Sequence, residues 1–133
     1  MTRQPTRLVL VVSSDPTRLR AYGVMARDAG AYPLAAPLLG RAIALVHKVR
    51  PSAVLVDVGL SDGRGLDLVR AMRAVPPLAH VPVVLLGMCG PDERAHLPHD
   101  PWTHGVHTRD DAALGALLRD LLEDERDERG VRA

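Results

Sequence analysis

The stretch that decides the fold is Ala53-Val54-Leu55-Val56-Asp57, an uninterrupted apolar run that ends in a carboxylate. A turn-rich stretch follows at once, Val58-Gly59-Leu60-Ser61-Asp62-Gly63-Arg64-Gly65. A strand that is buried on both faces consists almost entirely of residues such as Ala, Val and Leu, and open α/β sheets place their ligand sites at the carboxyl ends of such strands. The pattern therefore predicts a central parallel strand that places Asp57 at the carboxyl-end edge of a sheet, where ligand sites lie. The alternative is that Asp57 only braces the following loop.

The rest of the chain alternates short apolar runs with segments of helical spacing, which is typical of βαβ units and a parallel sheet. We predict five strands: Leu8–Val12, a weak strand near Tyr32–Ala36, the Asp57 run, residues 81–86 and a short strand around residues 105–108. Four apolar stripes at helical spacing predict the helices between and after them, led by Leu19 and Tyr22, by Ala42 and Val46, by Leu66 and Val69, and by Leu114, Leu118 and Leu121. Asp15-Pro16 begins the first helix and Gly30 ends it.

The length of 133 residues favours one domain, which we assign to residues 1–122, with a charged C-terminal tail at 123–133. Seventeen Lys and Arg against sixteen Asp and Glu leave a net charge of +1, which predicts no nucleic-acid partner and no membrane partner. Leu8–Val12 is too short for a signal-peptide core or a membrane span, so we expect a cytoplasmic protein. The single cysteine, Cys89, excludes an internal disulfide.

The order of the elements and the stretch from Asp57 to Gly65 resemble the receiver domain of bacterial response regulators, over residues 7–122. The resemblance implies an α/β, flavodoxin-like, doubly wound sheet of five parallel strands in the order 2-1-3-4-5, with helices on both faces. In that family an aspartate at the end of the third strand attacks a phosphohistidine, and an acidic pair after the first strand helps to hold Mg²⁺. Asp57 matches the phosphoacceptor, and Gly59 matches the residue whose carbonyl binds the metal.

The acidic pocket that this resemblance implies is depleted. The family's acidic pair aligns with Ser13 and Ser14, and only Asp15 follows in the third place. Because carboxylates are the ligands that hold Mg²⁺ in proteins, losing two of them weakens metal binding severely. Asp57 and Asp15 are the remaining candidates for a magnesium site, and we expect no metal there.

The switch positions of the family have changed as well. The hydroxyl residue at the end of the fourth strand aligns with Gly87, the lysine at the end of the fifth strand with His107, and the aromatic switch residue with His104. The only lysine, Lys48, lies on the second helix, and Arg109 is the better source of a permanent charge near His107. Phosphoryl transfer depends on charge stabilisation and positioning, so a site without these groups transfers slowly or not at all.

We therefore interpret the chain as an atypical, stand-alone receiver domain, not an enzyme, that acts in signal transduction through protein–protein interaction, independently of phosphorylation and without a cofactor. Asp57 would accept hydrogen bonds from Ser13, Ser14 or loop amides. The alternative is a response regulator of a two-component phosphorelay, in which Asp57 accepts phosphate from a histidine kinase and Mg²⁺ is the cofactor.

The segment between the fourth and fifth strands is unusual, because it contains three prolines where receivers carry their fourth helix. We predict a short or broken helix at 91–97. The region 91–122 is the predicted surface for a protein partner or for self-association, with Trp102 and Leu97 as its apolar anchor. The alternative is that Trp102 packs onto the core beneath the loop.

Two segments of the sequence suggest other ligands. Four histidines, at 96, 99, 104 and 107, suggest a zinc or nickel site with His96 and His99 as ligands and Asp100 as the carboxylate. Pro98, however, breaks the helix that would place His96 and His99 on one face. The loop Ser13-Ser14-Asp15-Pro16-Thr17 opens a helix after a strand, so it suggests a site for the phosphate of a flavin. With no Phe, two Tyr and one Trp, the chain has little to enclose a flavin ring. We expect neither ligand.

Overall fold

The structure is a computed structural model that describes residues 7–87, 95–106 and 111–130, with side chains in the last helix described as far as residue 123. A central sheet of five parallel strands has the order β2-β1-β3-β6-β7. Its strands are β1 (Leu8–Val12), β2 (Tyr32–Ala36), β3 (Ala53–Asp57), β6 (Val83–Leu86) and β7 (Thr103–Val106). Numbered among themselves, these strands have the predicted order 2-1-3-4-5, so the flavodoxin-like prediction is confirmed.

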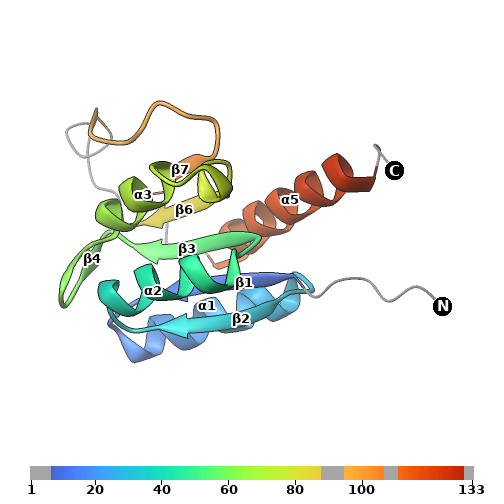
Figure 1. The fold of residues 1–133 in the computed structure, drawn as a ribbon. Coiled ribbons are helices and arrows are strands. Elements are labelled where there is room, and N and C mark those ends of the chain that lie inside the picture. Colours follow the sequence, from blue (N-terminus) through green and yellow to red (C-terminus); the bar gives the residue numbers. More distant parts are fainter. Residues whose placement is uncertain (1–6, 88–94, 107–110, 131–133) are drawn as a thin grey trace.

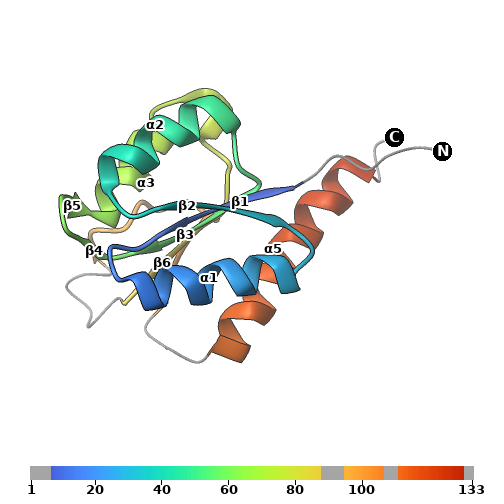
Figure 2. The same ribbon diagram turned by 90° about the horizontal axis from the view of Figure 1, so that it is seen from below.

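The helices form one layer on each face of the sheet (Figures 1 and 2). Helices α1 (Pro16–Asp28) and α5 (Asp111–Gly130) lie on one face, and α2 (Leu39–Val49) and α3 (Gly65–Arg73) on the other. A short 3₁₀ helix, η1 (Pro76–Leu78), follows α3 where the double proline stands. Within the described ranges, no helix is both long enough and apolar enough to span a bilayer.

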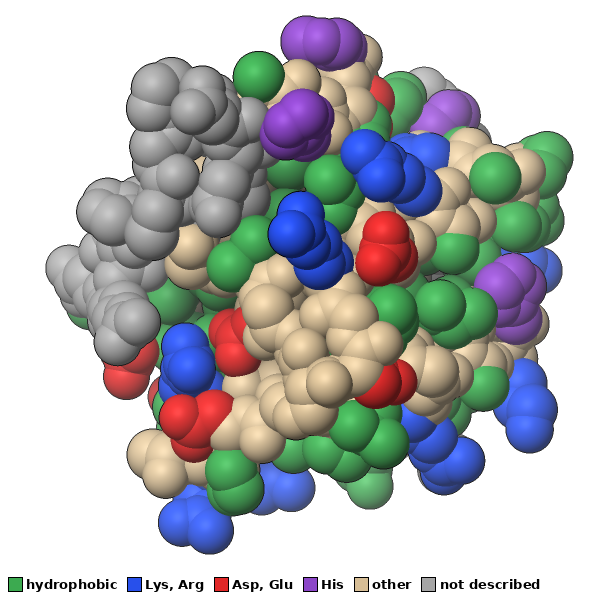
Figure 3. Space-filling view, turned by 90° about the vertical axis from the view of Figure 1, so that its left-hand side faces the viewer, with side chains coloured by type: hydrophobic (Ala, Val, Ile, Leu, Met, Phe, Trp, Pro, Cys, Tyr) green, Lys and Arg blue, Asp and Glu red, His purple; other side chains and the backbone are tan. Residues whose placement is uncertain are grey.

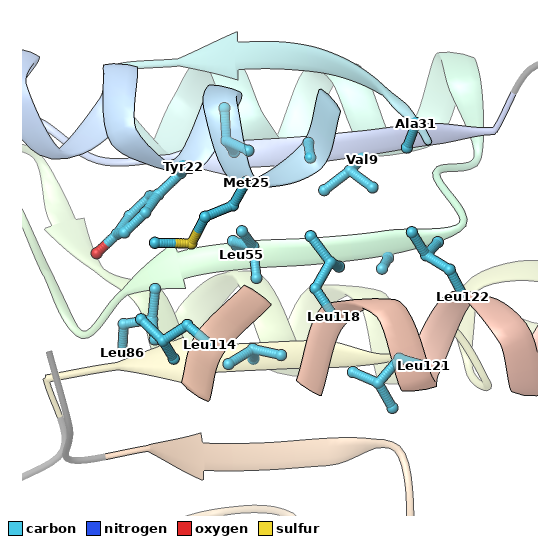
Figure 4. Packing of buried hydrophobic residues seen from close by; sticks show 14 residues of the cluster. Val9, Tyr22, Met25, Ala31, Leu55, Leu86, Leu114, Leu118, Leu121 and Leu122 are labelled. Carbon is cyan, nitrogen blue, oxygen red and sulfur yellow. The ribbon is translucent and has the colours of Figure 1, made fainter. Parts of the chain in front are cut away.

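Each helical layer packs on the sheet through its own apolar cluster. The strand residues alternate between the clusters: Val9, Val11 and Leu55 face α1 and α5, whereas Leu10, Val12 and Val54 face α2 and α3. β3 is buried along its whole length, as its continuous apolar sequence predicted. Figure 4 shows the first cluster, in which Leu114, Leu118 and Leu122 of α5 meet Met25 of α1 and Leu55 of β3.

Side chains of the loops determine where the helices start. Asp15 caps α1 as predicted, because its Oδ1 accepts hydrogen bonds from the amides of Thr17 and Arg18 at 2.9 and 3.4 Å. α2 has no cap of its own, and Asp62 replaces it from a distant loop by accepting the amides of Leu39 and Gly40 at 2.6 and 3.0 Å. Asp62 lies in the turn of a small hairpin that the sequence did not predict, formed by β4 (Gly59–Leu60) and β5 (Gly63–Arg64).

Two predicted strands have different bounds in the structure. The fourth strand begins at Val83 rather than at residue 81, because Pro82 precedes it and offers only its carbonyl, which accepts the amide of Val54 at 2.9 Å. The fifth strand runs from Thr103 to Val106, earlier than the predicted 105–108. The shift follows from its pairing with β6, in which the amide of Val83 donates to the carbonyl of Trp102 at 2.8 Å. Residues 107 and 108 lie outside the described ranges.

Arg73 of α3 holds the chain that leads into β7. Its guanidinium donates to Asp100 Oδ2 at 3.2 Å, to Thr103 Oγ1 at 3.0 Å and to the carbonyl of Leu78 at 3.2 Å. The pKa of Asp100 lies below its usual value: burial opposes this, but hydrogen bonds from the amide of Trp102 and the side chain of Thr103, together with the charge of Arg73, outweigh it. The carboxylate offered above as a zinc ligand is therefore engaged with Arg73.

The predicted apolar anchor is partly covered by the protein itself. Leu97 packs against the cluster on the α2 and α3 face, and the Trp102 indole stacks on the His80 ring with 4.2 Å between centroids and 25° between planes. Trp102 thus has a partner within the chain, but His80 is exposed and neither ring belongs to an apolar cluster, so both the anchor and the core alternative stay predictions. Most of the predicted helix at 91–97 lies outside the described residues, and the described part ends by residue 96.

Gly65 allows α3 to approach β3 closely, so Gly65→Ala should destabilise the protein. A Cβ atom there would collide with the Asp57 carbonyl oxygen and lie 2.7 Å from Leu85 Cδ1, and overpacking of this kind costs about 1–3 kcal/mol. Gly23→Ala is the matched control, because a Cβ there meets nothing closer than 3.9 Å and alanine favours the helix by up to about 1 kcal/mol. Urea unfolding of both variants measures the difference; equal stability would contradict the packing argument.

Asp62→Asn should make the free energy of unfolding depend less on pH in the acid range. The hydrogen bonds from the amides of Gly40 and Leu39 hold the pKa of Asp62 below the model-compound value of 3.8. Because the folded state holds this proton less tightly than the unfolded state, the stabilisation is present above pH 3.8 and is lost as pH falls through the folded pKa. Free energies of unfolding from pH 7 to pH 2.5 should fall less steeply in Asp62→Asn than in Asp120→Asn, an exposed carboxylate on α5. Identical slopes would exclude the distant cap.

Candidate functional site

Asp57 lies where the sequence placed it, at the carboxyl end of the central strand β3. Its residue is only 4% exposed, and the chain that follows is held by backbone hydrogen bonds from Val58 to Leu86 at 2.7 Å and from Gly65 to Val58 at 3.0 Å. A carboxylate with so little access to water needs partners within the protein. The candidate site consists of these partners and of the loop ends around them.

Three side chains reach the Asp57 carboxylate. Ser13 Oγ donates to Oδ2 at 2.5 Å, and the hydroxyl of Tyr22 donates to Oδ1. The Nε atom of Arg18 lies 3.8 Å from Oδ2. Ser13 is fully buried and Tyr22 is 5% exposed, so both hydroxyls lie in the interior with the carboxylate. We call these four residues the Asp57 cluster.

The Asp57 cluster contains one carboxylate, that of Asp57, and one guanidinium, that of Arg18. The Arg18 side chain is 45% exposed and lies 3.5 Å from Asp15 as well as near Asp57, so solvent screens it and it contributes at most about 1 kcal/mol. The two hydroxyl donors carry more weight, because hydrogen bonds to a charged group contribute about 1.5–3 kcal/mol. The carboxylate is thus satisfied by the chain's own side chains.

Helical spacing explains how α1 supplies two of these side chains. Asp15, Arg18 and Tyr22 stand at positions i, i+3 and i+7, which lie on one face of a helix. Because α1 starts beside the end of β1, its first two turns pass the end of the neighbouring strand β3, where Asp57 is. In Figure 4 the Tyr22 hydroxyl lies at the end of the apolar cluster nearest the arrowhead of β3.

Ser14 and Asp15 have other tasks. Ser14 Oγ donates to the carbonyl of Pro37 at 2.5 Å and accepts the amide of Ser61 at 2.9 Å, so it joins three loops at this edge. Asp15 caps α1, and hydrogen bonds from the amides of Arg18 and Thr17 are the largest cause of its lowered pKa. Of the predicted alternatives for a partner of Asp57, which were Ser13, Ser14 or loop amides, the structure shows Ser13. The carboxylate of Asp15 also takes the first helix amides that a flavin phosphate would need.

The residues around Asp57 do not fit a magnesium ion. Ser13 offers a hydroxyl that is already donated to Asp57, and the carboxylate of Asp15 is used by the helix start. The guanidinium of Arg18, 3.8 Å from the one remaining carboxylate, repels a second cation. Over the described ranges, no three His, Cys, Asp or Glu side chains come together as a metal site, and this includes His96, His99 and His104.

Of the residues predicted at the switch positions, the structure describes Gly87 and His104. Gly87 has a φ of +91°, which L residues with side chains rarely adopt, and its amide donates to the carbonyl of Val106. His104 pairs with Val84 in the sheet, and its buried Nε2 has no hydrogen-bond partner within the described part of the chain. Gly59 lies in β4 with open space where a Cβ would be. His107 and Arg109 are outside the described residues.

Neither Arg18 nor the role of Tyr22 was predicted from the sequence. Tyr22 does lie in the predicted apolar stripe of α1. A buried tyrosine hydroxyl needs a partner, and this signal pointed to the nearest buried carboxylate. The spacing from the cap Asp15 to Arg18 was the second signal. Figure 3 views the end of the molecule at which the parallel strands finish: acidic and basic side chains are interspersed over its described part, without a large acidic patch.

Comparison with known proteins agrees on the architecture. No protein-family model matches the sequence, and no curated protein matches it. Chemotaxis protein CheY4 of Vibrio cholerae superposes with a TM-score of 0.78 at 19% identity, over 88% of this chain and 99% of that one. The receiver domain of a signal transduction histidine kinase from Syntrophus aciditrophicus gives 0.76 at 19% identity, over 90% and 92%.

A third solved structure contains a magnesium ion. The receiver domain of a sensor histidine kinase from Pseudomonas aeruginosa, with a magnesium ion coordinated in its active-site cleft, has a TM-score of 0.76 and 19% identity, over 90% of this chain and 99% of that one. At such identities the likeness concerns the fold. The chain has the fold of the receiver domains of response regulators and sensor kinases.

Proposed function

We propose that this protein is a receiver-type signalling module that acts by binding another protein, and that Asp57 is not a phosphate acceptor. The observation that carries the proposal is the Asp57 cluster, in which both carboxylate oxygens accept hydrogen bonds from buried hydroxyls. The fold supports a role in signalling, since the structural neighbours are receiver domains. The cluster supports a role that does not depend on phosphate.

Phosphoryl transfer asks an acceptor oxygen to approach phosphorus in line while cations neutralise the developing charge. Here each oxygen of Asp57 is already bound, and 4% exposure leaves little room for a phosphoryl group. Freeing one oxygen would leave a buried hydroxyl without its acceptor, which costs about 1–3 kcal/mol. The site therefore resists the first step of the reaction.

The groups that stabilise a phosphoryl charge are replaced by groups that stabilise the bare carboxylate. Ser13 stands where an acidic residue would help to hold Mg²⁺, and it donates to Asp57 instead. Arg18 supplies the positive charge from within the chain. At the end of β6, Gly87 has neither a hydroxyl nor a backbone conformation that a serine or threonine readily adopts. This combination favours a permanently set site over a switch.

Incubation with acetyl phosphate and MgCl₂ should leave the mass of the protein unchanged. Without a metal pocket and with both oxygens bound, Asp57 has no means to accept the phosphoryl group. Intact-mass spectrometry detects an adduct of one phosphate, with Asp57→Asn as the control and a receiver that retains its acidic pair treated in parallel. A stoichiometric adduct on the wild-type chain that Asp57→Asn abolishes would establish the alternative, a phosphorylatable response regulator.

Tyr22→Phe should destabilise the protein by about 1–3 kcal/mol, because it leaves the Asp57 carboxylate short of a donor in the interior. Tyr32→Phe is the matched control, since Tyr32 lies on β2 and is 56% exposed. Urea unfolding at pH 7 measures both. If the two variants were equally stable, the hydroxyl of Tyr22 would not support Asp57 and the cluster would lose its proposed role.

A further inference from the structure

A groove of about 400 Å³ runs between α1 and the edge strand β2, on the face of the sheet opposite α2 and α3. Its floor includes Val11 of β1 and Ala35 of β2, and Leu19 lies along its α1 side. Its lining includes no residue of the Asp57 cluster and no described residue of the predicted partner surface at 91–122.

The wall that α1 contributes has a regular pattern. Arg20, Gly23, Val24 and Arg27 line the groove and stand at i, i+3, i+4 and i+7, so they form one stripe along two turns of the helix. Val24 is 52% exposed, although it is apolar. Gly23 costs helix stability relative to alanine, but it lets another backbone approach the helix closely. The stripe thus presents a small apolar centre between two cations.

The two cations are available to a partner. Arg20 and Arg27 are both exposed, and neither has an ion-pair partner in the part of the chain that the structure describes. Two turns of helix separate them by roughly 10.5 Å along the axis. A ligand that pairs with both must therefore place two negative charges at a similar distance, with apolar groups between them.

The edge strand disfavours binding by strand addition. The amide of Tyr32 donates to the carbonyl of Arg7, so in the parallel pairing with β1 the alternate residues Pro33 and Ala35 direct their backbone groups away from the sheet. Pro33 has no N–H to offer there, which leaves Ala35 as the outward amide donor between Tyr32 and Ala36. The groove is suited to side chains rather than to an added strand.

Two occupants from the same chain are unsuitable. A symmetric dimer through this groove would place the arginines of one copy against those of the other, which is repulsive. The acid-rich tail at 123–129 has charge but contains no apolar residue to fill the groove. The groove therefore fits a segment that carries both negative charge and apolar side chains.

We propose that the groove between α1 and β2 binds an amphipathic, acidic helical segment of a partner protein. Such a segment carries two carboxylates at i and i+7, opposite Arg20 and Arg27, and apolar side chains at i+3 and i+4 that enter the groove beside Gly23 and Val24. The inference rests on the proposed function in requiring a protein partner, but it does not depend on the chemistry of Asp57.

The test is a peptide-display selection on the unphosphorylated, full-length protein with a random 16-residue library. Selected peptides should pair acidic residues with apolar ones, and amide chemical shifts should change mainly along α1 and β2 when a peptide is added. The double variant Arg20→Glu and Arg27→Glu should weaken binding at least tenfold. The matched control is Arg41→Glu with Lys48→Glu, which reverses two exposed charges at the same i, i+7 spacing on α2.

Gly23→Leu adds a second test, since it fills the groove without changing charge, and it should abolish binding while circular dichroism confirms the fold. Basic or neutral selected peptides, the absence of any selected peptide, equal binding by the two double variants, or shifts confined to residues 95–106 would each overturn the groove proposal. Phosphorylation of Asp57 in the mass assay would instead overturn the proposed function and leave the groove proposal intact, so the two failures are distinguishable.

Discussion

A carboxylate buried at the end of a central strand must be satisfied from within the protein, and the arrangement at Asp57 depends on that constraint. Ser13 comes from the end of β1, Tyr22 and Arg18 come from α1, and Asp57 ends β3. The hydrogen bonds therefore tie a helix to two neighbouring strands at one point. This point fixes the position of the first turns of α1 over the sheet, while the apolar cluster of Figure 4 holds the rest of the helix.

The site differs from a metal-dependent receiver pocket in the origin of its positive charge. In such a pocket an external cation, which can bind and dissociate, neutralises a group of carboxylates. Here the guanidinium of Arg18 belongs to the chain and is always charged. Hydroxyl donors at Ser13 and Tyr22 replace the ligand geometry of an ion with fixed hydrogen bonds. A sheet of this fold can thus end its central strand in a carboxylate whose partners all come from the chain itself.

The parts of the fold with a strong apolar pattern were predictable from sequence. β1, β2, β3 and α2 have the predicted bounds or nearly so, because continuous burial and helical period leave a clear trace in the residue order. The start of β6 was misplaced because the strand begins only after Pro82. Both bounds of β7 were misplaced because they depend on its pairing with β6, which is distant in sequence. The hydrogen bond from Ser13 to Asp57 was predicted as one of several options. The contacts of Tyr22, Asp62 and Arg73 join residues that are distant in sequence, so they became visible only in the tertiary structure.

The bridge made by Ser14 has a mechanical consequence. It binds the carbonyl of Pro37 and the amide of Ser61, and Asp62, the next residue, holds the first amides of α2. The loop after β1, the loop after β2 and the β4–β5 hairpin are consequently cross-linked through side chains. Opening of the hairpin would therefore also release the first amides of α2, so movements of these three loops are coupled through the side chains of Ser14 and Asp62.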